Sequence, residues 1–397
     1  MIKFDFKTYV NNYFSSEELA DILNKKKDVI SKFSSSNMIG WTRELDQETI
    51  AEIKKTGSYI KNNFDLLVVI GIGGSFLGSY AFDKMFRKYF NDDKFEIIYA
   101  GTTLSSKYLD ELVNYLKDKN FCINVISKSG TTMETTITYK ILKDVLKRKY
   151  DSEELKKHII ITTDKESGKL RQEVNKKGYK SFIIPNDIGG RYSFITPAHL
   201  LPLSINYDID KIVKGYFHGK RLIDSAYLYA ATRYLLFKHG KFIENFSVDE
   251  ENISYFCEWL KQLFGETEGK NGKGIYPTST IYTRDLHSLG QFIQDGNKIL
   301  FETFLRVKDN NNYIEYDNRN LNEINNVVID SVIRAHSTGN VPCLEIEMDE
   351  LNTENIASLI YFFQLAAAFS GYLFEINPFN QPGVEIYKEE VRKSLAN

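Results

Sequence analysis

Cysteine and net charge are both scarce in this chain of 397 residues. Its cysteines are Cys122, Cys257 and Cys343, an odd number at wide spacing. That pattern argues against a disulfide framework or a cysteine-rich metal site and favours reduced thiols in a cytoplasm. Lysine and arginine number 51 against 53 aspartates and glutamates, so the formal net charge is −2. No global field therefore recruits nucleic acid or an anionic membrane, and specificity must come from a local site.

Long apolar runs and a secretion signal are also missing. The N-terminal stretch MIKFDFKTYVNNYF has no uninterrupted apolar core and no small-residue cleavage site, so it is not expected to be a secretory signal. No stretch reads as the ~18 apolar residues that a membrane span needs. The six histidines show no metal-ligand spacing. We therefore expect a cytoplasmic protein with no membrane, nucleic-acid or metal partner.

Short apolar runs alternate with amphipathic helical patterns from Leu66 onward. The runs are LLVVI, FEIIYA, FCINVIS, HIIITT and SFIIP. Buried apolar strands that alternate with helices are typical of a doubly wound parallel sheet, so this part of the chain predicts an α/β domain. A helical region is expected over residues 209–264. A second alternation follows it, with the expected strands GIYPTSTIYT, KILFETFLRV and CLEIEM.

The two alternations predict a pair of similar α/β units in tandem. The expected boundaries are a helical N-terminal segment over 1–60, a first α/β domain over 61–207, a second over 208–380 and a C-terminal helix over 381–397. A length of 397 residues fits two domains of ordinary size. No sequence repeat is strong enough to indicate an internal duplication.

A glycine-rich turn follows the first predicted strand. The strand ends in GIGGSFLGS, where glycines such as Gly74 let the backbone approach a ligand and Ser75 opens the next helix. The turn fits a dinucleotide loop poorly, because its glycine spacing departs from G-x-G-x-x-G. The next strand, FEIIYAGTT, also ends without the acidic residue that would hold a ribose.

The third predicted strand ends in ISKSGTTMET, which gathers hydroxyls and a glycine at a strand-to-helix junction. Helix N-termini supply unpaired N–H groups and a partial positive charge, so such a junction suits a phosphate dianion. The expected side-chain donors are Ser127, Ser129 and Thr132. One hydroxyl alone would more often be an N-cap, but several beside a second Gly-Ser turn favour a phosphate cradle. Whether Lys128 contributes its backbone amide, its charge or neither stays open.

Together, GIGGSFLGS and SKSGTT resemble the sugar-isomerase (SIS) type of phosphosugar-binding domain, a family of both enzymes and non-catalytic regulators. Four further stretches narrow the resemblance: GGRYSFITPAHLLPL, GETEGKNGKGIYPTS, TRDLHSLGQFIQDG and NPFNQPGVEIYK. In this order, the six motifs resemble the glucose-6-phosphate isomerase family in its shorter bacterial form. The resemblance implies two tandem SIS-type domains. It also implies reversible isomerisation of glucose 6-phosphate and fructose 6-phosphate through a cis-enediol, without a cofactor.

The resemblance also implies roles for single residues. The family's catalytic base is the first glutamate of an E-S-x-G-K motif, and Glu266 occupies that place with Thr267 in the serine position. Long forms of the family carry asparagine at the position of Glu268, which favours Glu266 as the base. We expect Glu266 on a glycine-bordered loop, where little bulk surrounds it. Arg191 matches the arginine that faces the enediolate oxygens, where a fixed cation stabilises negative charge.

Three residues nearer the C-terminus match family positions as well. His287, on a helical pattern, matches the histidine of ring opening, and Lys388 matches the lysine assigned to the same step. Gln381 matches the glutamine near the reacting carbons, although the following Pro382 stands where long forms more often have tryptophan. The other histidines match no catalytic position and are interpreted as structural: His158, His199, His218, His239 and His336.

The resemblance further implies a homodimer in which the helix bearing His287 reaches into the partner's active site. The expected small-molecule partner is a hexose 6-phosphate. Two alternatives stay open, namely an isomerase of broader hexose-6-phosphate specificity and a non-catalytic phosphosugar-binding regulator. The regulator would be marked by the absence of Glu266, Arg191 or His287, and all three are present.

Overall fold

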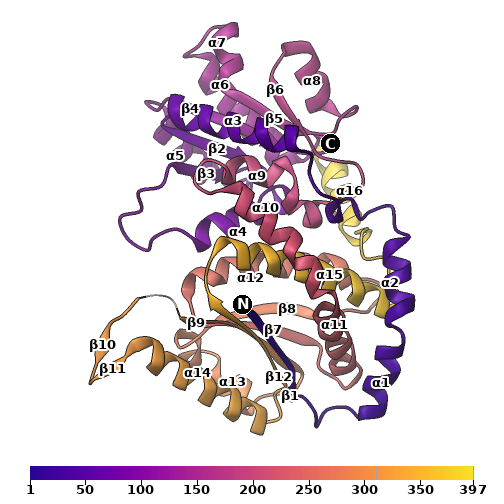
Figure 1. The fold of residues 1–397 in the computed structure, drawn as a ribbon. Helices are drawn as coiled ribbons and strands as arrows, with labels where there is room; N and C mark the ends of the chain where they lie inside the picture. Colours follow the sequence, from indigo (N-terminus) through magenta and orange to yellow (C-terminus); the bar gives the residue numbers. More distant parts are fainter. Residues whose placement is uncertain (310–311, 397) are drawn as a thin grey trace. The chain divides into compact units, whose positions relative to one another are not determined.

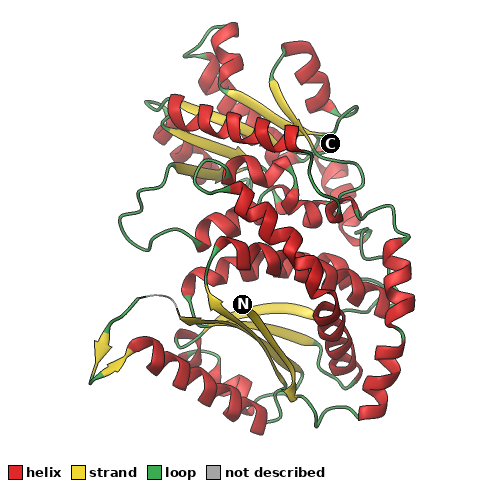
Figure 2. Ribbon diagram, viewed as in Figure 1, coloured by secondary structure: helices red, strands yellow, loops and turns green. Residues whose placement is uncertain are grey.

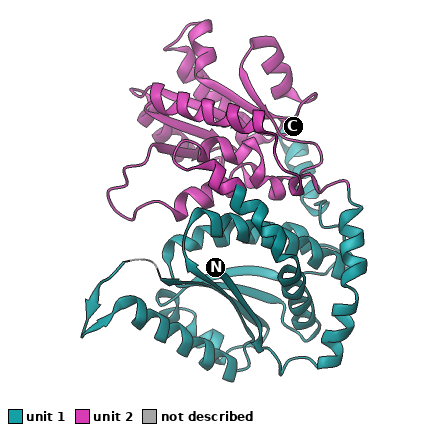
Figure 3. Ribbon diagram, viewed as in Figure 1, with its two compact units in different colours: residues 1–36, 214–397 teal, residues 37–213 magenta. Residues whose placement is uncertain are grey.

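The computed structural model describes residues 1–309 and 312–396 (Figure 1). Helices and strands alternate along most of this length (Figure 2). The chain divides into two compact units (Figure 3). Unit 2 is the continuous stretch Asn37–Val213, and unit 1 combines Met1–Ser36 with Lys214–Asn397. The expected N-terminal segment is therefore shared between the units, and the expected C-terminal helix belongs to unit 1.

Unit 2 contains a parallel five-stranded sheet that follows the predicted apolar runs. Its strands are β2 (Leu66–Ile70), β3 (Glu96–Ala100), β4 (Phe121–Ile126), β5 (Ile159–Thr163) and β6 (Lys180–Ile183). They lie in the order β3-β2-β4-β5-β6. Every residue of β2, β4 and β5 is buried, as a continuous aliphatic run requires when helices cover both faces. The prediction of a doubly wound α/β fold is confirmed.

Helices of unit 2 supply apolar side chains to the core of this sheet, among them Leu112, Leu142 and Val174. The helices are η1 (Gly40–Thr42), α3 (Gln47–Asn63), η2 (Gly73–Ser75), α4 (Leu77–Met85), α5 (Ser106–Leu116), α6 (Met133–Lys147), α7 (Ser152–Lys157), α8 (Lys169–Lys177), η3 (Gly190–Ile195) and α9 (Pro197–Leu203), with η for a 3-10 helix. Helix α10 (Ile209–His218) leads from unit 2 into unit 1.

Unit 1 contains a second five-stranded sheet. Its strands are β1 (Ile2–Tyr9), β7 (Ile243–Val248), β8 (Tyr276–Ile281), β9 (Leu300–Asp309) and β12 (Cys343–Glu350). Read from the other edge, the order β8-β7-β9-β12-β1 repeats the order of unit 2 for its parallel strands. The fifth place is taken by β1, which pairs antiparallel with β12, Phe4 opposite Ile346. The prediction of two similar tandem units is confirmed at the level of topology.

Unit 1 also contains further helices and a short hairpin. They are α1 (Ser16–Asn24), α2 (Lys26–Ser34), η4 (Gly219–Leu222), α11 (Ile223–Lys238), η5 (Glu251–Ile253), α12 (Ser254–Glu268), η6 (Arg284–His287), α13 (Gly290–Asp295), the short hairpin β10 (Glu315–Tyr316) and β11 (Arg319–Asn320), α14 (Leu321–Thr338), α15 (Thr353–Leu373) and α16 (Gly383–Ala396).

Two strands of the five-stranded sheet of unit 1 were not predicted, and neither was the short β10–β11 hairpin. The segment Ile2–Tyr9 forms β1, so the expected helical N-terminal segment begins with a strand. The segment Ile243–Val248 forms β7, an interior strand between β9 and β8, inside a region expected to be helical. The sequence IENFSV does not indicate a buried strand, because Glu244, Asn245 and Ser247 are polar. All three are nevertheless almost fully buried. Partners on both faces of the sheet, rather than apolar character, make this burial possible.

Helix α15 is long and apolar enough to cross a membrane, judged by length and composition alone. Of its most apolar window, 94% is buried inside the protein, and the core helix of a globular protein passes the same test. Uncharged polar residues such as Ser358 and Gln364 interrupt it, which is why no apolar run stood out in the sequence. The burial of α15 identifies it as a core helix of unit 1.

A buried ionic cluster centred on Arg233 of α11 joins several elements of unit 1. The Arg233 Nε donates to Glu244 of β7 at 2.7 Å, and the guanidinium also donates to both carboxylate oxygens of Glu268 in α12. A third partner is the Ser370 hydroxyl of α15, at 3.0 Å. All three charged side chains are fully buried. Removing one member of such a buried ionic cluster is strongly destabilising, because it leaves an uncompensated charge in the core.

We therefore expect Arg233→Met to lower the free energy of unfolding of unit 1 by about 3–5 kcal/mol, because it leaves two buried carboxylates without their cation. Urea titration followed by circular dichroism measures the change. The matched control is Lys261→Met on α12, whose partner Glu258 is half exposed. The control should alter stability by less than about 0.5 kcal/mol. Equal stability of the two variants would contradict this role of Arg233.

Candidate functional site

The carboxyl end of the unit 2 sheet brings the two predicted phosphate turns together. Strands β2 and β4 are parallel neighbours, with Ile70 opposite Val125, so the turns after them begin side by side. The chain adds β3 on one side of β2 and β4 on the other, which makes this the point where the strand order reverses. In open α/β sheets, ligands bind outside the strand ends at such a point.

The turn after β4 is ordered by its own hydroxyls. Ser127 is buried, and its Oγ accepts a hydrogen bond from the Gly130 N–H at 3.0 Å. The exposed Ser129 Oγ accepts hydrogen bonds from the N–H and hydroxyl of Thr131, at 3.2 and 3.0 Å. Thr132 stands at the N-cap of α6, but its side chain makes no capping hydrogen bond. Its hydroxyl and the first N–H groups of α6 are thus available to an anion.

The Lys128 ammonium is bound by backbone carbonyls. Its Nζ donates to the backbone carbonyls of Pro185, Asn186 and Ile188, at 3.2, 3.0 and 3.4 Å. Burial lowers the pKa of Lys128 below its ordinary value. The ammonium therefore ties the turn after β4 to the segment that leads into η3, and the backbone amide is left as the group of Lys128 that can face a ligand.

The turn after β2 contacts the turn that carries Arg191. A Cβ on Gly74 would overlap the carbonyl carbon of Gly190, so only glycine permits this approach of the two backbones. Ser75, half-buried, ends the 3-10 turn of which Gly74 is part. Arg191 in η3 is 3% exposed. The structure thus places Gly74, Ser75 and Arg191 on adjoining turns of unit 2.

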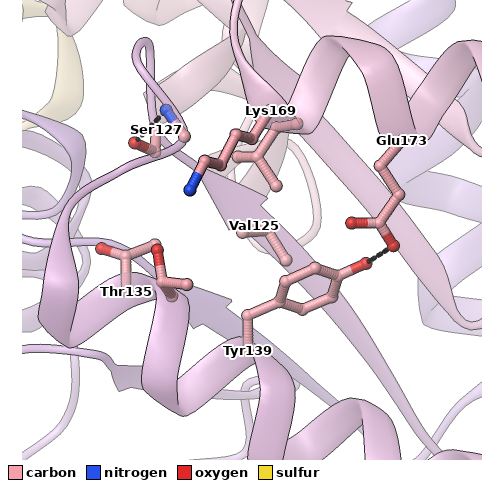
Figure 4. A pocket seen from close by; sticks show the side chains of 9 residues that line it. Val125, Ser127, Thr135, Tyr139, Lys169 and Glu173 are labelled. Atoms are coloured by element: carbon pink, nitrogen blue, oxygen red, sulfur yellow. Dashed lines mark hydrogen bonds between the residues drawn. The ribbon is translucent and has the colours of Figure 1, made fainter.

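A cavity of about 160 Å³ lies behind the turn after β4 (Figure 4). Ser127 lines one side of it, and the other side is closed by Tyr139, whose hydroxyl donates to Glu173 at 2.8 Å. The Lys169 side chain points into the cavity. Sequence reasoning did not single out Lys169, because in KESGKL it reads as one of several solvated charges. The only signal in the sequence was the glycine before it, Gly168, whose φ of +95° is seen in the structure.

In unit 1, Glu266 lies in the last turn of α12, and the expectation of a loop position is wrong. The helix runs through Gly265, and the glycine-rich loop begins only at Gly269. Glu266 is half-buried, and its Oε1 accepts a hydrogen bond from Gln262 Nε2 at 3.2 Å. The base candidate therefore stands on a helix, which holds it more firmly than a loop would.

Glu268 has a different environment from Glu266. It is fully buried, binds Arg233, and its Oε2 accepts the Ile275 N–H at 3.2 Å. Gly274 packs against it, since a Cβ there would lie 2.8 Å from the Glu268 backbone carbonyl. Glu268 thus closes the 269–274 loop onto the end of α12. These contacts give Glu268 a structural role and favour Glu266 as the reactive carboxylate.

The remaining predicted residues lie on separate elements of unit 1. His287 is exposed and ends the 3-10 turn η6; the expected helix begins only at Gly290. Lys388 on α16 donates to Glu385 one turn earlier, at 2.8 Å. Gln381 is exposed between α15 and α16. Within residues 1–309 and 312–396, no group of three or more His, Cys, Asp or Glu side chains is arranged to hold a metal ion.

Comparisons with known proteins identify similar chains. A model of the phosphoglucose isomerase family matches residues 21–328. Glucose-6-phosphate isomerase of Staphylococcus saprophyticus is 40% identical, over 96% of this chain and 93% of its own length. That of Mesoplasma florum is 42% identical, over 92% of each chain.

Solved structures share the fold at lower identity. A hypothetical protein of Thermus thermophilus superposes with a TM-score of 0.86 at 23% identity, covering 100% of both chains. Glucose-6-phosphate isomerase of Chlamydia trachomatis superposes with a TM-score of 0.80 at 19% identity, covering 91% of this chain and 77% of its own. With the family model and the relatives at 40–42% identity, these similarities lead to one conclusion. The chain belongs to the phosphoglucose isomerase family.

Proposed function

We propose that this chain catalyses the reversible isomerisation of glucose 6-phosphate and fructose 6-phosphate in glycolysis and gluconeogenesis. The observation that carries this function is the 40–42% identity, over more than nine tenths of the chain, to proteins named glucose-6-phosphate isomerase. The phosphate-type turns of unit 2 and the half-buried Glu266 of unit 1 supply the chemistry that the reaction needs. No redox cofactor takes part in the balance, because a proton and an electron pair move within one sugar.

Glu266 acts as the base in this scheme. It removes the proton from carbon 2 of the open-chain aldose and returns it to carbon 1 of the cis-enediol, which gives the ketose. Proton removal next to a carbonyl leaves negative charge on the oxygens, and the buried guanidinium of Arg191 is the cation proposed to stabilise it. His287 and Lys388 assist ring opening, and Gln381 orients the oxygens of the substrate or a water.

The phosphate group is bound by the turns at the carboxyl end of the unit 2 sheet. Ser75, Ser127, Ser129 and Thr132 are the proposed side-chain ligands, with the backbone at Gly74 and the amide of Lys128 beside them. Ser127 and Ser129 accept hydrogen bonds inside the turn, and each hydroxyl keeps its own hydrogen to donate to a phosphate oxygen. Several donors at a helix N-terminus suit a dianion.

The direct test of this function is a coupled assay of the purified protein with a panel of hexose 6-phosphates in the presence of a chelator. Conversion of fructose 6-phosphate to glucose 6-phosphate is the expected result. Turnover of mannose 6-phosphate at a comparable rate would indicate the broader specificity instead. Binding of these sugars without turnover would identify a regulator and overturn the proposed activity.

We expect Glu266→Gln to reduce kcat by about 10²–10⁴-fold, because the amide cannot accept the carbon-bound proton. Affinity for glucitol 6-phosphate, which keeps the phosphate but has no carbonyl, should change little, because the cradle lies on other residues. Glu258→Gln, at an exposed position of the same helix, is the matched control and should keep wild-type kcat. A Glu266→Gln enzyme with unchanged kcat would refute the assignment of the base.

Thr132→Ala should act mainly on substrate affinity. A hydrogen bond to a charged group contributes about 1.5–3 kcal/mol, so KM for fructose 6-phosphate should rise about tenfold or more. Steady-state kinetics measures the change, with Ser106→Ala at the exposed N-terminus of α5 as the control. A large fall in kcat at constant KM would show that Thr132 does not bind the phosphate as proposed.

The family resemblance also supports a homodimer with shared active sites in a cytoplasmic location. His287 is exposed, and so are the apolar side chains of Leu289 and Phe292 just after it, at 46% and 48% exposure. An apolar surface beside a reactive histidine suits insertion of this segment into a second copy. In such a dimer, each site combines Glu266 and Arg191 of one chain with His287 of the other.

Mixing two inactive variants tests the shared site. In a mixed dimer of Glu266→Gln and His287→Ala chains, one site holds both lesions and the other holds neither. Co-refolding at equal amounts gives about half mixed dimers, hence roughly a quarter of wild-type activity if the two sites are independent. Mixed dimers that are confirmed by mass spectrometry but remain inactive would place His287 in its own chain's site.

A further inference from the structure

His199 of α9 is buried inside unit 2, with 1% of its surface exposed. Its two ring nitrogens contact two different backbone segments. Nδ1 lies 3.0 Å from the Ser79 backbone nitrogen at the start of α4. Nε2 lies 2.8 Å from the Gly74 carbonyl oxygen and 3.0 Å from the Ser193 Oγ. One imidazole therefore links the turn after β2, the helix that follows it, and the η3 turn of Arg191.

The contacts fix the tautomer of His199. A backbone N–H can only donate, so Nδ1 must accept from Ser79 and carries no proton. The proton is then on Nε2, which donates to the Gly74 carbonyl. Burial lowers the pKa of His199 to about 4, so the ring is neutral at neutral pH and keeps this tautomer. With this tautomer, both ring nitrogens make hydrogen bonds to the backbone, Nδ1 as acceptor and Nε2 as donor.

Ser193 completes the connection between the two turns. Its hydroxyl has one hydrogen, which can be donated to either of two carbonyls, Gly190 at 2.6 Å or Gly74 at 2.9 Å. The Oγ also lies 3.0 Å from His199 Nε2. The ring of His199 rests on Gly78, where an added Cβ would lie 3.0 Å from it. The Gly74 carbonyl thus accepts from His199 Nε2–H and has the Ser193 hydroxyl as a second donor within reach, one residue before Ser75 and in contact with the turn of Arg191.

We propose that His199 is a positioning residue, which holds the Gly73–Ser75 turn of the phosphate cradle in register with the turn that carries Arg191. The role rests on the proposed function, because these turns bind the phosphate and stabilise the enediolate only if the chain is the isomerase. Without the Nε2–H bond, the Gly74 carbonyl loses a buried donor, and the turn can shift away from Gly190. A shift of either turn changes both the phosphate grip and the place of Arg191.

Three substitutions separate this role from simple core packing. His199→Phe fills the space without hydrogen bonds, and we expect it to raise KM for fructose 6-phosphate about tenfold and to lower kcat by a similar factor. His199→Gln can place an amide N–H near the position of Nε2, and His199→Asn can place an amide oxygen near that of Nδ1. Gln should restore both constants to within about threefold of wild type, while Asn should remain impaired.

The matched control is His158→Phe. His158 is also buried in unit 2, and its Nδ1 contacts the Phe121 carbonyl at 2.8 Å. It precedes β5, at the amino-terminal edge of the sheet and away from the cradle. Loss of its hydrogen bond should lower the thermal unfolding midpoint and leave KM and kcat unchanged.

The inhibition constant of inorganic phosphate provides a readout of the cradle alone. It should rise about tenfold in His199→Phe and stay near the wild-type value in His158→Phe. A His199→Phe enzyme that is less stable but keeps wild-type kcat, KM and phosphate inhibition would overturn the proposal. If His199→Phe does not fold, equal kinetics of the Gln and Asn variants would overturn it.

The two proposals can fail separately. A wild-type protein that binds phosphate but turns over no hexose phosphate would refute the isomerase function. In that case, phosphate affinity measured by calorimetry in wild type and the three variants still decides the role of His199: weaker binding in Phe and Asn than in Gln supports it, and equal binding refutes it.

Discussion

The burial of one guanidinium between two carboxylates is the constraint on which unit 1 depends. Arg233 can remain charged in the core only because Glu244 and Glu268 both reach it, and the excess negative charge is in turn bound by further donors. Tyr229 and Thr303 donate to Glu244. The strand β7, the end of α12 and the helix α15 are therefore held at one point, and a strand with polar residues can lie inside the sheet, between β9 and β8.

The same constraint accounts for the setting of Glu266. Successive residues of a helix are about 100° apart, so Glu266 and Glu268 point to nearly opposite sides of α12. With Glu268 bound to Arg233 in the core, Glu266 is turned toward the outer side and is half-buried. Two glutamates that look equivalent in the sequence GETEG thus have distinct environments, one suited to structure and the other to proton transfer.

Local pattern was a good guide wherever burial is apolar on both faces. The aliphatic runs of β2, β4 and β5 predicted their strands. The hydroxyl-rich stretch after β4 was correctly placed at a strand-to-helix junction, before α6. The strand β7 was not predicted, because its polar residues Glu244 and Ser247 have buried polar partners that only the folded chain supplies. In β1, the period-two alternation of IKFDFKTY was present and usable, but the segment was read with the helices that follow it.

In the candidate site, too, motifs indicated which residue types are present, whereas the local structure around those residues depends on tertiary packing. The residue types at Arg191, Glu266 and Thr132 could be read from the motifs. The helical setting of Glu266 could not, because glycines in GETEGKNGKG signal a loop while packing of α12 extends the helix to Glu268. The contact of Gly74 with Gly190 joins residues more than a hundred positions apart, and no spacing rule relates them.

Because β1 pairs with β12, the sheet of unit 1 can be completed only after β12 has been synthesised. Strand β1 pairs with β12, Ile2 opposite Met348, whereas all of Asn37–Val213 forms a continuous unit. At a synthesis rate of about 5–20 residues per second, β1 waits on the order of 20 to 70 s for its partner strand. During that interval unit 2 can already fold. The alternating charged side chains Lys3, Asp5 and Lys7 are of the kind that disfavours pairing of an unpaired strand with other chains.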